Sequence, residues 1–274
     1  MFKSILELAR PINVLITMLS IFIGAFITGT IQPFYYVVIA CLSGGLITAA
    51  SNSINDYFDI DIDKINKPHR PLPLGNITMK SCFKISMMEY LLGIILSFII
   101  SPQMAVIAIS VSLLTYLYAA YLKRTILWGN FAVSLCTAAT FIYGGLSVNR
   151  PLQAIMPSLF AFFYHFGREI IKDLQDIEGD ARNAVITFPV RFGIQPSIFL
   201  IWINFIILII LTIFPFWRGW YGTTYFLVVL LGVYPIVLYS IISIIKNTSE
   251  KHLGFVSNLL KADMLIGLLA IYVR

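Results

Sequence analysis

The sequence contains few charged residues, and this scarcity determines its class. Of 274 residues only 12% are charged, whereas 59% are hydrophobic. A soluble domain carries about a quarter charged residues, so the composition excludes an ordinary soluble fold. The net charge of +6 is spread over separate short segments. Because a nucleic-acid site needs a basic patch or stripe, we expect no nucleic-acid partner.

Cysteine and histidine are also scarce, with three residues of each. The cysteines are Cys41, Cys82 and Cys136; their number is odd, and they show no CxxC spacing. We therefore expect buried free thiols and not a disulfide framework. A metal site in this chain must then rely on oxygen ligands, which select hard cations such as Mg²⁺ or Ca²⁺.

Long hydrophobic runs are what the chain does contain. Runs of about 20 apolar residues are typical of membrane spans, and lipid leaves no partner for backbone polar groups, so such spans are helical. The sequence therefore predicts an all-α, polytopic membrane protein. The first run is preceded by Lys3 and Arg10, but no convincing cleavage site follows it, so we expect it to be retained. The nine runs cover approximately residues 12–30, 34–54, 82–100, 103–122, 126–148, 152–172, 197–214, 223–245 and 254–273.

The distribution of lysine and arginine predicts the orientation in the membrane. With a cytoplasmic N-terminus, nine spans place fifteen basic residues inside and only Arg150, Arg218 and Arg274 outside, while Lys261 lies in the last span. This asymmetry follows the positive-inside rule. We therefore expect a multi-pass protein of the cell membrane with its C-terminus outside.

Aspartate is concentrated in two short stretches, which hold seven of the eight aspartates. Each stretch repeats a spacing of three and then four residues, and the second lies 117 residues after the first. On one continuous helix such positions fall within roughly 60° of one another, so each stretch is predicted to present three carboxylates from one face. The six residues are Asp56, Asp59 and Asp63, and then Asp173, Asp176 and Asp180.

Both stretches lie at the cytoplasmic end of an even-numbered span. This correspondence favours a single transmembrane domain, residues 1–274, made of two related halves at roughly 1–124 and 125–274.

Carboxylates gathered at the membrane edge repel one another unless they bind cations or protons. Because Mg²⁺ bridges carboxylates to substrate phosphates, two acid clusters among basic residues predict a diphosphate site with two Mg²⁺ ions. Lys67, Arg70, Lys123 and Arg168 are the cations expected to stabilise the departing diphosphate. A diphosphate site that opens between membrane helices favours a substrate with a lipid tail, and a prenyl diphosphate meets that requirement.

These residues resemble the two signature motifs of the UbiA-type intramembrane prenyltransferases. The matching residues are Asn55-Asp56-x-x-Asp59-x-x-x-Asp63 and Asp173-x-x-Asp176-x-x-x-Asp180, and the likeness extends to Arg10-Pro-x-Asn13, Arg70-Pro71 and Tyr118 to Arg124. The resemblance implies a helical bundle around a central cavity and Mg²⁺-dependent transfer of a prenyl chain.

The resemblance also implies roles for individual residues. The six motif aspartates are expected to be catalytic, with Asp56, Asp59, Asp173, Asp176 and Asp180 as metal ligands. Diphosphate or phosphate contacts are expected from Asn55, Lys67, Arg70, Lys123, Arg168 and Lys172, and other substrate contacts from Asn13, Asn52 and Tyr118.

The run Arg168 to Asp180 is similar to the archaeal-type branch of the family, which transfers geranylgeranyl to geranylgeranylglyceryl phosphate. Three alternatives stay open. The acceptor is aromatic in the quinone-type branches. A transporter also carries membrane acids and repeats, although its charged site normally lies near the bilayer midplane. A prenyl phosphatase or membrane terpene cyclase would share the diphosphate site.

Overall fold

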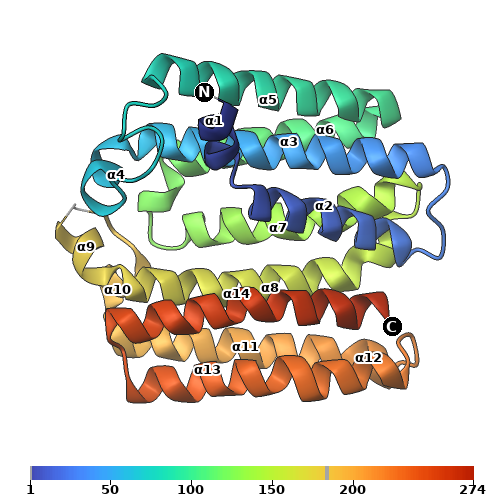
Figure 1. The fold of residues 1–274 in the computed structure, drawn as a ribbon. Coiled ribbons are helices and arrows are strands. Elements are labelled where there is room, and N and C mark those ends of the chain that lie inside the picture. The colour runs from blue at the N-terminus through green and yellow to red at the C-terminus, as the bar shows by residue number, and fades with distance from the viewer. Residues whose placement is uncertain (1, 183–184) are drawn as a thin grey trace. The chain divides into compact units, whose positions relative to one another are not determined.

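The computed structural model describes residues 2–182 and 185–274, and every regular element in these ranges is a helix. The predicted all-α class is confirmed (Figure 1). The helices are α1 (Phe2–Ala9), α2 (Pro11–Phe26), α3 (Phe34–Phe58), α4 (Ile60–Asn66), α5 (Met79–Ile100), α6 (Pro102–Ala120), η1 (Leu122–Arg124), α7 (Trp128–Ser147), η2 (Pro151–Ala154), α8 (Ile155–Gln175), α9 (Ile177–Arg182), α10 (Phe188–Phe192), α11 (Ile194–Trp217), α12 (Thr223–Val228), η3 (Val229–Val233), α13 (Tyr234–Lys246) and α14 (Glu250–Tyr272).

Seven helical segments in the described ranges are long and apolar enough to cross a membrane, and an eighth is formed if α1 and α2 make one span bent by 52°. The chain is a multi-pass membrane protein, but the count of nine spans stays a prediction. The remaining candidate for a ninth span is α8. This helix is long enough to cross a membrane, but it carries four charged residues near its end, Arg168, Glu169, Lys172 and Asp173. The segment from α12 to α13 is continuous through one π-helical stretch, η3.

The chain forms two compact units. Unit 1 comprises Met1–Tyr121 and Ala139–Ala154, and unit 2 comprises Leu122–Ala138 and Ile155–Arg274. Helix α7 contributes its first part to unit 2 and its last part to unit 1. The predicted single domain with two related halves is not tested by this division and stays a prediction.

In unit 1, α3 is the central helix. It packs against α2, α5 and α6, and these helices run alongside it in Figure 1. Small residues permit close approach, as is common between membrane helices: Gly93 of α5 lies against the Ser43 carbonyl, which a Cβ would meet at 3.0 Å. The Ser43 hydroxyl donates to the Gly93 carbonyl over 2.7 Å and shares a hydrogen bond with the Tyr143 hydroxyl. These three polar groups inside the unit are thereby paired.

In unit 2, α8 packs against α11 and α14, while α13 packs against both α11 and α14. Gly167 of α8 lies against Asn204 and Phe205 of α11, and the Asn204 amide donates to the Phe163 carbonyl over 2.7 Å. Tyr164 of α8 donates to Asp263 of α14 over 2.7 Å. These contacts keep α8, which carries the second aspartate motif, against two neighbouring helices.

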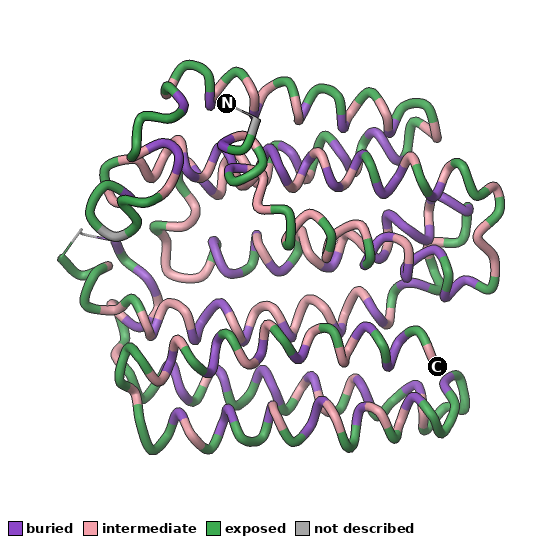
Figure 2. The backbone as a smooth tube through the Cα atoms, in the orientation of Figure 1, coloured by how far each residue is buried: buried purple, intermediate pink, exposed green. Residues whose placement is uncertain are grey.

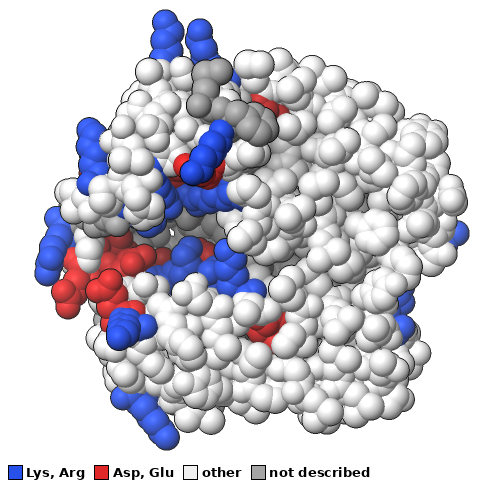
Figure 3. Space-filling model, viewed as in Figure 1, with Lys and Arg blue, Asp and Glu red and all other residues white. Residues whose placement is uncertain are grey.

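The outward faces of the long helices are apolar. Figure 2 shows buried and exposed positions alternating along them, and many exposed positions are large hydrophobic residues, for example Leu91, Ile210 and Leu231. Charged atoms occupy only a few places on the face seen in Figure 3. Exposed apolar helix faces are what a lipid environment requires.

Candidate functional site

The first aspartate motif crosses a helix end. Helix α3 ends at Phe58, Asp59 occupies the junction, and α4 begins at Ile60. The prediction that one continuous helix carries all three aspartates is therefore wrong, because the chain turns at Asp59 (φ −95°, ψ 5°). Backbone hydrogen bonds from Asp59 to Asn55 and from Asp63 to Asp59 still connect the two helices, so the motif stays compact.

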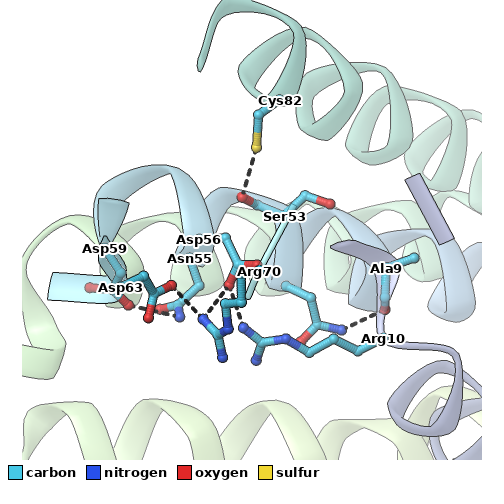
Figure 4. A network of polar contacts seen from close by, with 10 residues as sticks. Ala9, Arg10, Ser53, Asn55, Asp56, Asp59, Asp63, Arg70 and Cys82 are labelled. Carbon is cyan, nitrogen blue, oxygen red and sulfur yellow. Dashed lines mark hydrogen bonds and ion pairs between the residues drawn. The ribbon is translucent and has the colours of Figure 1, made fainter. Parts of the chain in front are cut away.

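Two arginines converge on this motif. Arg70 donates from Nη1 to Asp56 over 2.8 Å and to Asp63 over 2.5 Å, and Arg10 also donates to Asp56 Oδ1. Both carboxylates are only 3% exposed. Figure 4 shows the two guanidinium groups side by side against the Asp56 carboxylate. Asp56 and Asp63 are thus arranged around positive charge.

Local packing explains how these arginines reach the motif. The loop that carries Arg70 is held by Leu72 and Ile77, which are buried with Leu8 of α1 and Cys82 of α5. Arg10 lies at the bend between α1 and α2 with a left-handed backbone (φ 51°). The adjacent Ala9 carbonyl accepts from the Asn52 amide over 2.8 Å. Arg10 was not among the predicted site residues, although its position before Pro11 was part of the family resemblance.

The remaining predicted residues of unit 1 lie on several elements. Asn52 and Asn55 are on α3, and the Asn55 amide donates to Asp59 Oδ2 over 3.0 Å. Asn13 is in the first turn of α2, and Tyr118 is in the last turn of α6. Lys67 follows α4 and is exposed. Four of these residues are therefore on helices that pack with α3 or on α3 itself, and Lys67 is at the surface.

The second motif also crosses a helix end. Asp173 is in α8, Asp176 occupies the junction, and Asp180 is in α9. The prediction of one continuous helix is wrong here too, because the helix is interrupted at Asp176. Asp173 Oδ2 accepts from the amide of Asn130 over 2.7 Å. Asn130 is on α7 and only 5% exposed. Sequence reasoning did not identify Asn130, whose only signal was a polar residue near the start of an apolar run.

Arg168 and Lys172 lie on α8 just before Asp173. Both contact the carboxylate of Glu169: Arg168 Nη1 at 3.2 Å and Lys172 Nζ at 2.8 Å. The Arg168 Nε also donates to the Ser257 carbonyl of α14 over 3.1 Å. Glu169 is 6% exposed, so a buried carboxylate holds two cations on one side of α8.

Asp180 has an unusual environment for a carboxylate outside the spans. The pKa of Asp180 is raised to about 6, chiefly by burial and also by the nearby charge of Asp176, while a hydrogen bond from Thr187 lowers it in part. The Thr187 hydroxyl lies 3.3 Å from Asp180 Oδ2. A carboxyl with this pKa is poised to exchange its proton for a metal ion near neutral pH.

Lys123 is in the short helix η1, which ends at Arg124, and α7 begins at Trp128. Gly129, in the first turn of α7, lies directly against η1: a Cβ at this position would be 2.9 Å from the Leu122 carbonyl oxygen and 3.0 Å from the Lys123 Cα. Asn130 is the next residue. The first turn of α7 therefore contacts both the Lys123 segment and the carboxylate of Asp173.

The carboxylates do not form a closed metal cage. In the described ranges, no group of three or more Asp, Glu, His or Cys side chains is gathered so that it could hold a metal ion. Mg²⁺ commonly binds to one or two carboxylates and completes its coordination with water and phosphate oxygens. Asp56 and Asp63 already share one cationic partner, Arg70. The oxygen donors therefore fit Mg²⁺ that is shared with a phosphate ligand.

Comparison with known proteins gives a consistent picture. The profile of the UbiA prenyltransferase family matches residues 16–259. The chain is 33% identical over 261 residues to digeranylgeranylglyceryl phosphate synthase of Methanosphaera stadtmanae, covering 95% of each chain. A solved structure described as digeranylgeranylglyceryl phosphate synthase in membranes is 31% identical, with a TM-score of 0.83 and coverage of 99% of this chain and 97% of that one. A UbiA homologue from Archaeoglobus fulgidus, bound to DMAPP and Mg²⁺, shares the fold at 20% identity and a TM-score of 0.70, with coverage of 98% and 99%.

Proposed function

Because this chain belongs to the UbiA prenyltransferase family, we propose that it transfers a geranylgeranyl group from geranylgeranyl diphosphate to geranylgeranylglyceryl phosphate. The product, digeranylgeranylglyceryl phosphate, is a precursor of ether-linked membrane lipids. The observation that carries this proposal is the likeness to digeranylgeranylglyceryl phosphate synthase over 95% of both chains, together with both aspartate motifs.

The proposed reaction breaks one bond and forms another. The bond between C1 of the geranylgeranyl chain and the diphosphate oxygen breaks, and its electron pair leaves with the diphosphate. The hydroxyl oxygen of the acceptor then supplies the electron pair of the new ether bond to C1. Its proton is released to water, so atoms and charge balance.

The six motif aspartates are the proposed binding groups for the metal-diphosphate complex, with Asp56, Asp59, Asp173, Asp176 and Asp180 as metal ligands. When bound, Mg²⁺ neutralises the diphosphate and makes it a better leaving group. We propose two ions, one for each motif. The A. fulgidus homologue supports this choice of metal, since it binds DMAPP and Mg²⁺.

The cations of the chain are proposed to stabilise the charge that develops on the departing diphosphate. Preorganised cations act more strongly at a site of reduced dielectric than in water. Arg70 is already oriented by Asp56 and Asp63, and it can turn to phosphate when a metal ion takes over those carboxylates. Lys67, Lys123 and Asn55 are proposed as further diphosphate contacts, and Asn13, Asn52 and Tyr118 as contacts to the rest of the substrate.

The orientation in the membrane is also part of the proposal. The positive-inside distribution supports an orientation with the N-terminus and both motifs on the cytoplasmic side and the C-terminus outside. A water-soluble diphosphate product would then be released into the cytoplasm.

A transfer assay tests the function directly. Purified protein in lipid nanodiscs is given Mg²⁺ and radiolabelled geranylgeranyl diphosphate, with geranylgeranylglyceryl phosphate or hydroxybenzoate as acceptor. We expect labelled ether lipid with the glyceryl phosphate alone. Product with hydroxybenzoate alone would move the chain to an aromatic-acceptor branch. Release of diphosphate without transfer would favour a phosphatase or cyclase, and no reaction with any substrate would contradict the proposal.

A further inference from the structure

The charged residues near the end of α8 have different partners, although they are close together in the sequence. Lys172 Nζ lies 2.8 Å from Glu169, whereas Asp173, the next residue, accepts from Asn130 of α7. Arg168 makes its ion pair with the same Glu169. The carboxylate of Asp173 is thereby held by a neutral amide and not by a cation of α8. The two cations, Arg168 and Lys172, share the Glu169 carboxylate.

We propose that Arg168 and Lys172, positioned by Glu169, form a binding site for the phosphomonoester of the lipid acceptor. This inference rests on the proposed function and adds a specific role for these residues. It assigns them to the acceptor phosphate and separates them from the groups that bind the donor diphosphate. Glu169 is a positioning residue, since its carboxylate contacts the two cations and they contact the ligand.

Burial and charge support an anionic ligand here. The side chains of Arg168 and Glu169 are only 14% and 8% exposed, and that of Lys172 is 38% exposed. Two cations in such a place are costly unless they are compensated. Within the group of Arg168, Glu169 and Lys172, one carboxylate faces two cations, so these three residues carry a net positive charge. A phosphate ester, which carries about −1.5 to −2 charges at pH 7, supplies the missing negative charge.

The group also has hydrogen-bond donors left for a ligand. Arg168 uses Nε for the Ser257 carbonyl and Nη1 for Glu169, and a guanidinium has five N–H donors in all. An ammonium has three donors, and Lys172 gives one to Glu169. His165 lies one turn earlier on the same face of α8, and its Nδ1 is buried with no hydrogen-bond partner among the described residues. An incoming phosphate oxygen would satisfy that nitrogen.

The acceptor phosphate suits this site better than the donor diphosphate. The proposed diphosphate site already contains the metal carboxylates and Arg70, Lys67 and Lys123. The α8 group lies near the end of a long helix, between residues 165 and 172 of Ile155–Gln175, at the end that the positive-inside rule predicts to lie at the cytoplasmic membrane surface. An acceptor that lacks a phosphate would not require a second cationic site in addition to the diphosphate site.

Binding measured without donor and without Mg²⁺ tests the proposal independently of catalysis. The probe is radiolabelled geranylgeranylglyceryl phosphate, with unphosphorylated geranylgeranylglycerol for comparison. Loss of one charge-assisted hydrogen bond typically weakens binding about tenfold or more. We therefore expect Arg168→Gln and Lys172→Met each to weaken binding of the phosphorylated probe by about tenfold or more, with little change for the unphosphorylated one.

Two control variants make this result specific. Arg182→Gln removes an arginine from an exposed Arg–Glu pair in the same unit, in which the two side chains are 80% and 84% exposed, and should not change probe binding. Asp176→Asn removes a proposed metal ligand, so it should abolish turnover while binding of the phosphorylated probe is retained. Equal loss of binding in Arg168→Gln and Asp176→Asn would overturn the separation of the two sites.

Steady-state kinetics test the role of Glu169. Glu169→Gln should raise the KM for geranylgeranylglyceryl phosphate several-fold and leave the KM for geranylgeranyl diphosphate near the wild-type value. Glu169→Asp, which keeps the charge, should recover part of the loss. An increase in the donor KM alone would assign the cations to the diphosphate and overturn the proposal.

The experiments distinguish failure of the proposed function from failure of the phosphomonoester site alone. A wild-type protein that prenylates only hydroxybenzoate, and does not bind the phosphorylated probe more tightly than geranylgeranylglycerol, contradicts both proposals. A wild-type protein that makes the ether lipid, but whose Arg168→Gln variant binds the probe normally, contradicts only the phosphomonoester site.

Discussion

Two arginines contact Asp56, although Asp56 and Arg10 are separated by 46 residues and Asp56 and Arg70 by 14. At the residue scale this contact explains how a nearly buried carboxylate keeps its charge at the membrane edge, because paired guanidinium groups offset part of the cost of burial. The same pairing leaves the arginines in position to meet phosphate oxygens when a metal ion binds to the carboxylate.

Replacement of Asp56 or Asp173 tests the roles of the two motifs. Asp56→Asn and Asp173→Asn preserve side-chain size but remove a negative charge, so we expect transfer activity to fall by about 10²–10³-fold. Size-exclusion chromatography of the purified variants checks that they remain folded. Near-normal activity in either folded variant would show that the corresponding motif does not bind the metal-diphosphate complex.

Asn130 offers a test at the residue that holds Asp173. Asn130→Ala removes the 2.7 Å hydrogen bond to Asp173, so the carboxylate is less well oriented for a metal ion. We expect the Mg²⁺ concentration for half-maximal activity to rise by about tenfold, as is typical for a lost hydrogen bond to a charged group. Ser134→Ala is the matched control, because Ser134 is buried on the same helix and its hydroxyl donates to the Asn130 backbone carbonyl, not to the side-chain amide. A lower kcat with unchanged Mg²⁺ dependence would contradict the orienting role.

The raised pKa of Asp180 predicts a dependence of stability on pH. Its pKa of about 6 in the folded protein lies above the usual value of about 3.9. The folded state therefore holds this proton more tightly than the unfolded state, and stability from this group is lost as pH rises through about 6. In EDTA, Asp180→Asn should raise the Tm at pH 7.5, and the difference should shrink toward pH 4. A lower Tm for the variant at pH 7.5 would contradict the burial of this carboxyl.

At the scale of elements, the first turn of α7 combines two functions in adjacent residues. Gly129 lets the turn approach η1, and Asn130 contacts the second motif. Such an arrangement requires a glycine, because any Cβ at this position meets the backbone of Leu122 and Lys123. The turn therefore couples the position of a proposed phosphate-binding lysine to that of a proposed metal ligand.

Gly129→Ala tests this coupling. The added Cβ must displace η1, since it would lie 2.9 Å from the Leu122 carbonyl oxygen, and Lys123 moves with it. We expect the KM for geranylgeranyl diphosphate to rise several-fold in a folded protein. Gly267→Ala is the control, because in the described part of the chain no atom outside the local backbone of α14 lies within 4 Å of its Cβ position and alanine favours helix. A similar KM in both variants would show that η1 tolerates the shift.

At the scale of the whole molecule, the membrane determines which surfaces are apolar and which ends carry charge. The long helices expose residues such as Leu231, which is 73% exposed, and Phe199, which is 67% exposed. These faces would aggregate in water but are stable in lipid. The same environment accounts for the predicted unequal distribution of lysine and arginine between the two sides.

Labelling of introduced cysteines in intact cells tests the orientation. Arg218→Cys and Ser249→Cys both lie at exposed positions between the last helices. We expect a membrane-impermeant thiol reagent to modify Cys at 218 in intact cells, and Cys at 249 only after lysis. A background with Cys41, Cys82 and Cys136 replaced by alanine avoids native signals. The opposite pattern would reverse the predicted topology.

The helical class, the apolar spans and the two aspartate motifs followed from the sequence by itself, because each depends on residues close together in the chain. Hydrophobicity over about 20 residues identifies a span without knowledge of its neighbours, and the three-and-four spacing is visible within eight residues. The spacing could not show that the chain turns at Asp59 and Asp176, since one irregular residue leaves no signal in a periodic pattern.

Only the tertiary structure decided which charged groups meet. Arg10 reaches Asp56 from a bend in the first helices, and Asn130 reaches Asp173 across 43 residues. Glu169 forms ion pairs with Lys172 and Arg168, whereas Asp173 accepts a hydrogen bond from the Asn130 amide. Such pairings depend on which helix faces pack together. The packing of these faces is determined by close contacts at residues such as Gly129 and Gly167. Local sequence fixes the residue types that are present, whereas packing determines the partner of each charge and so its chemistry.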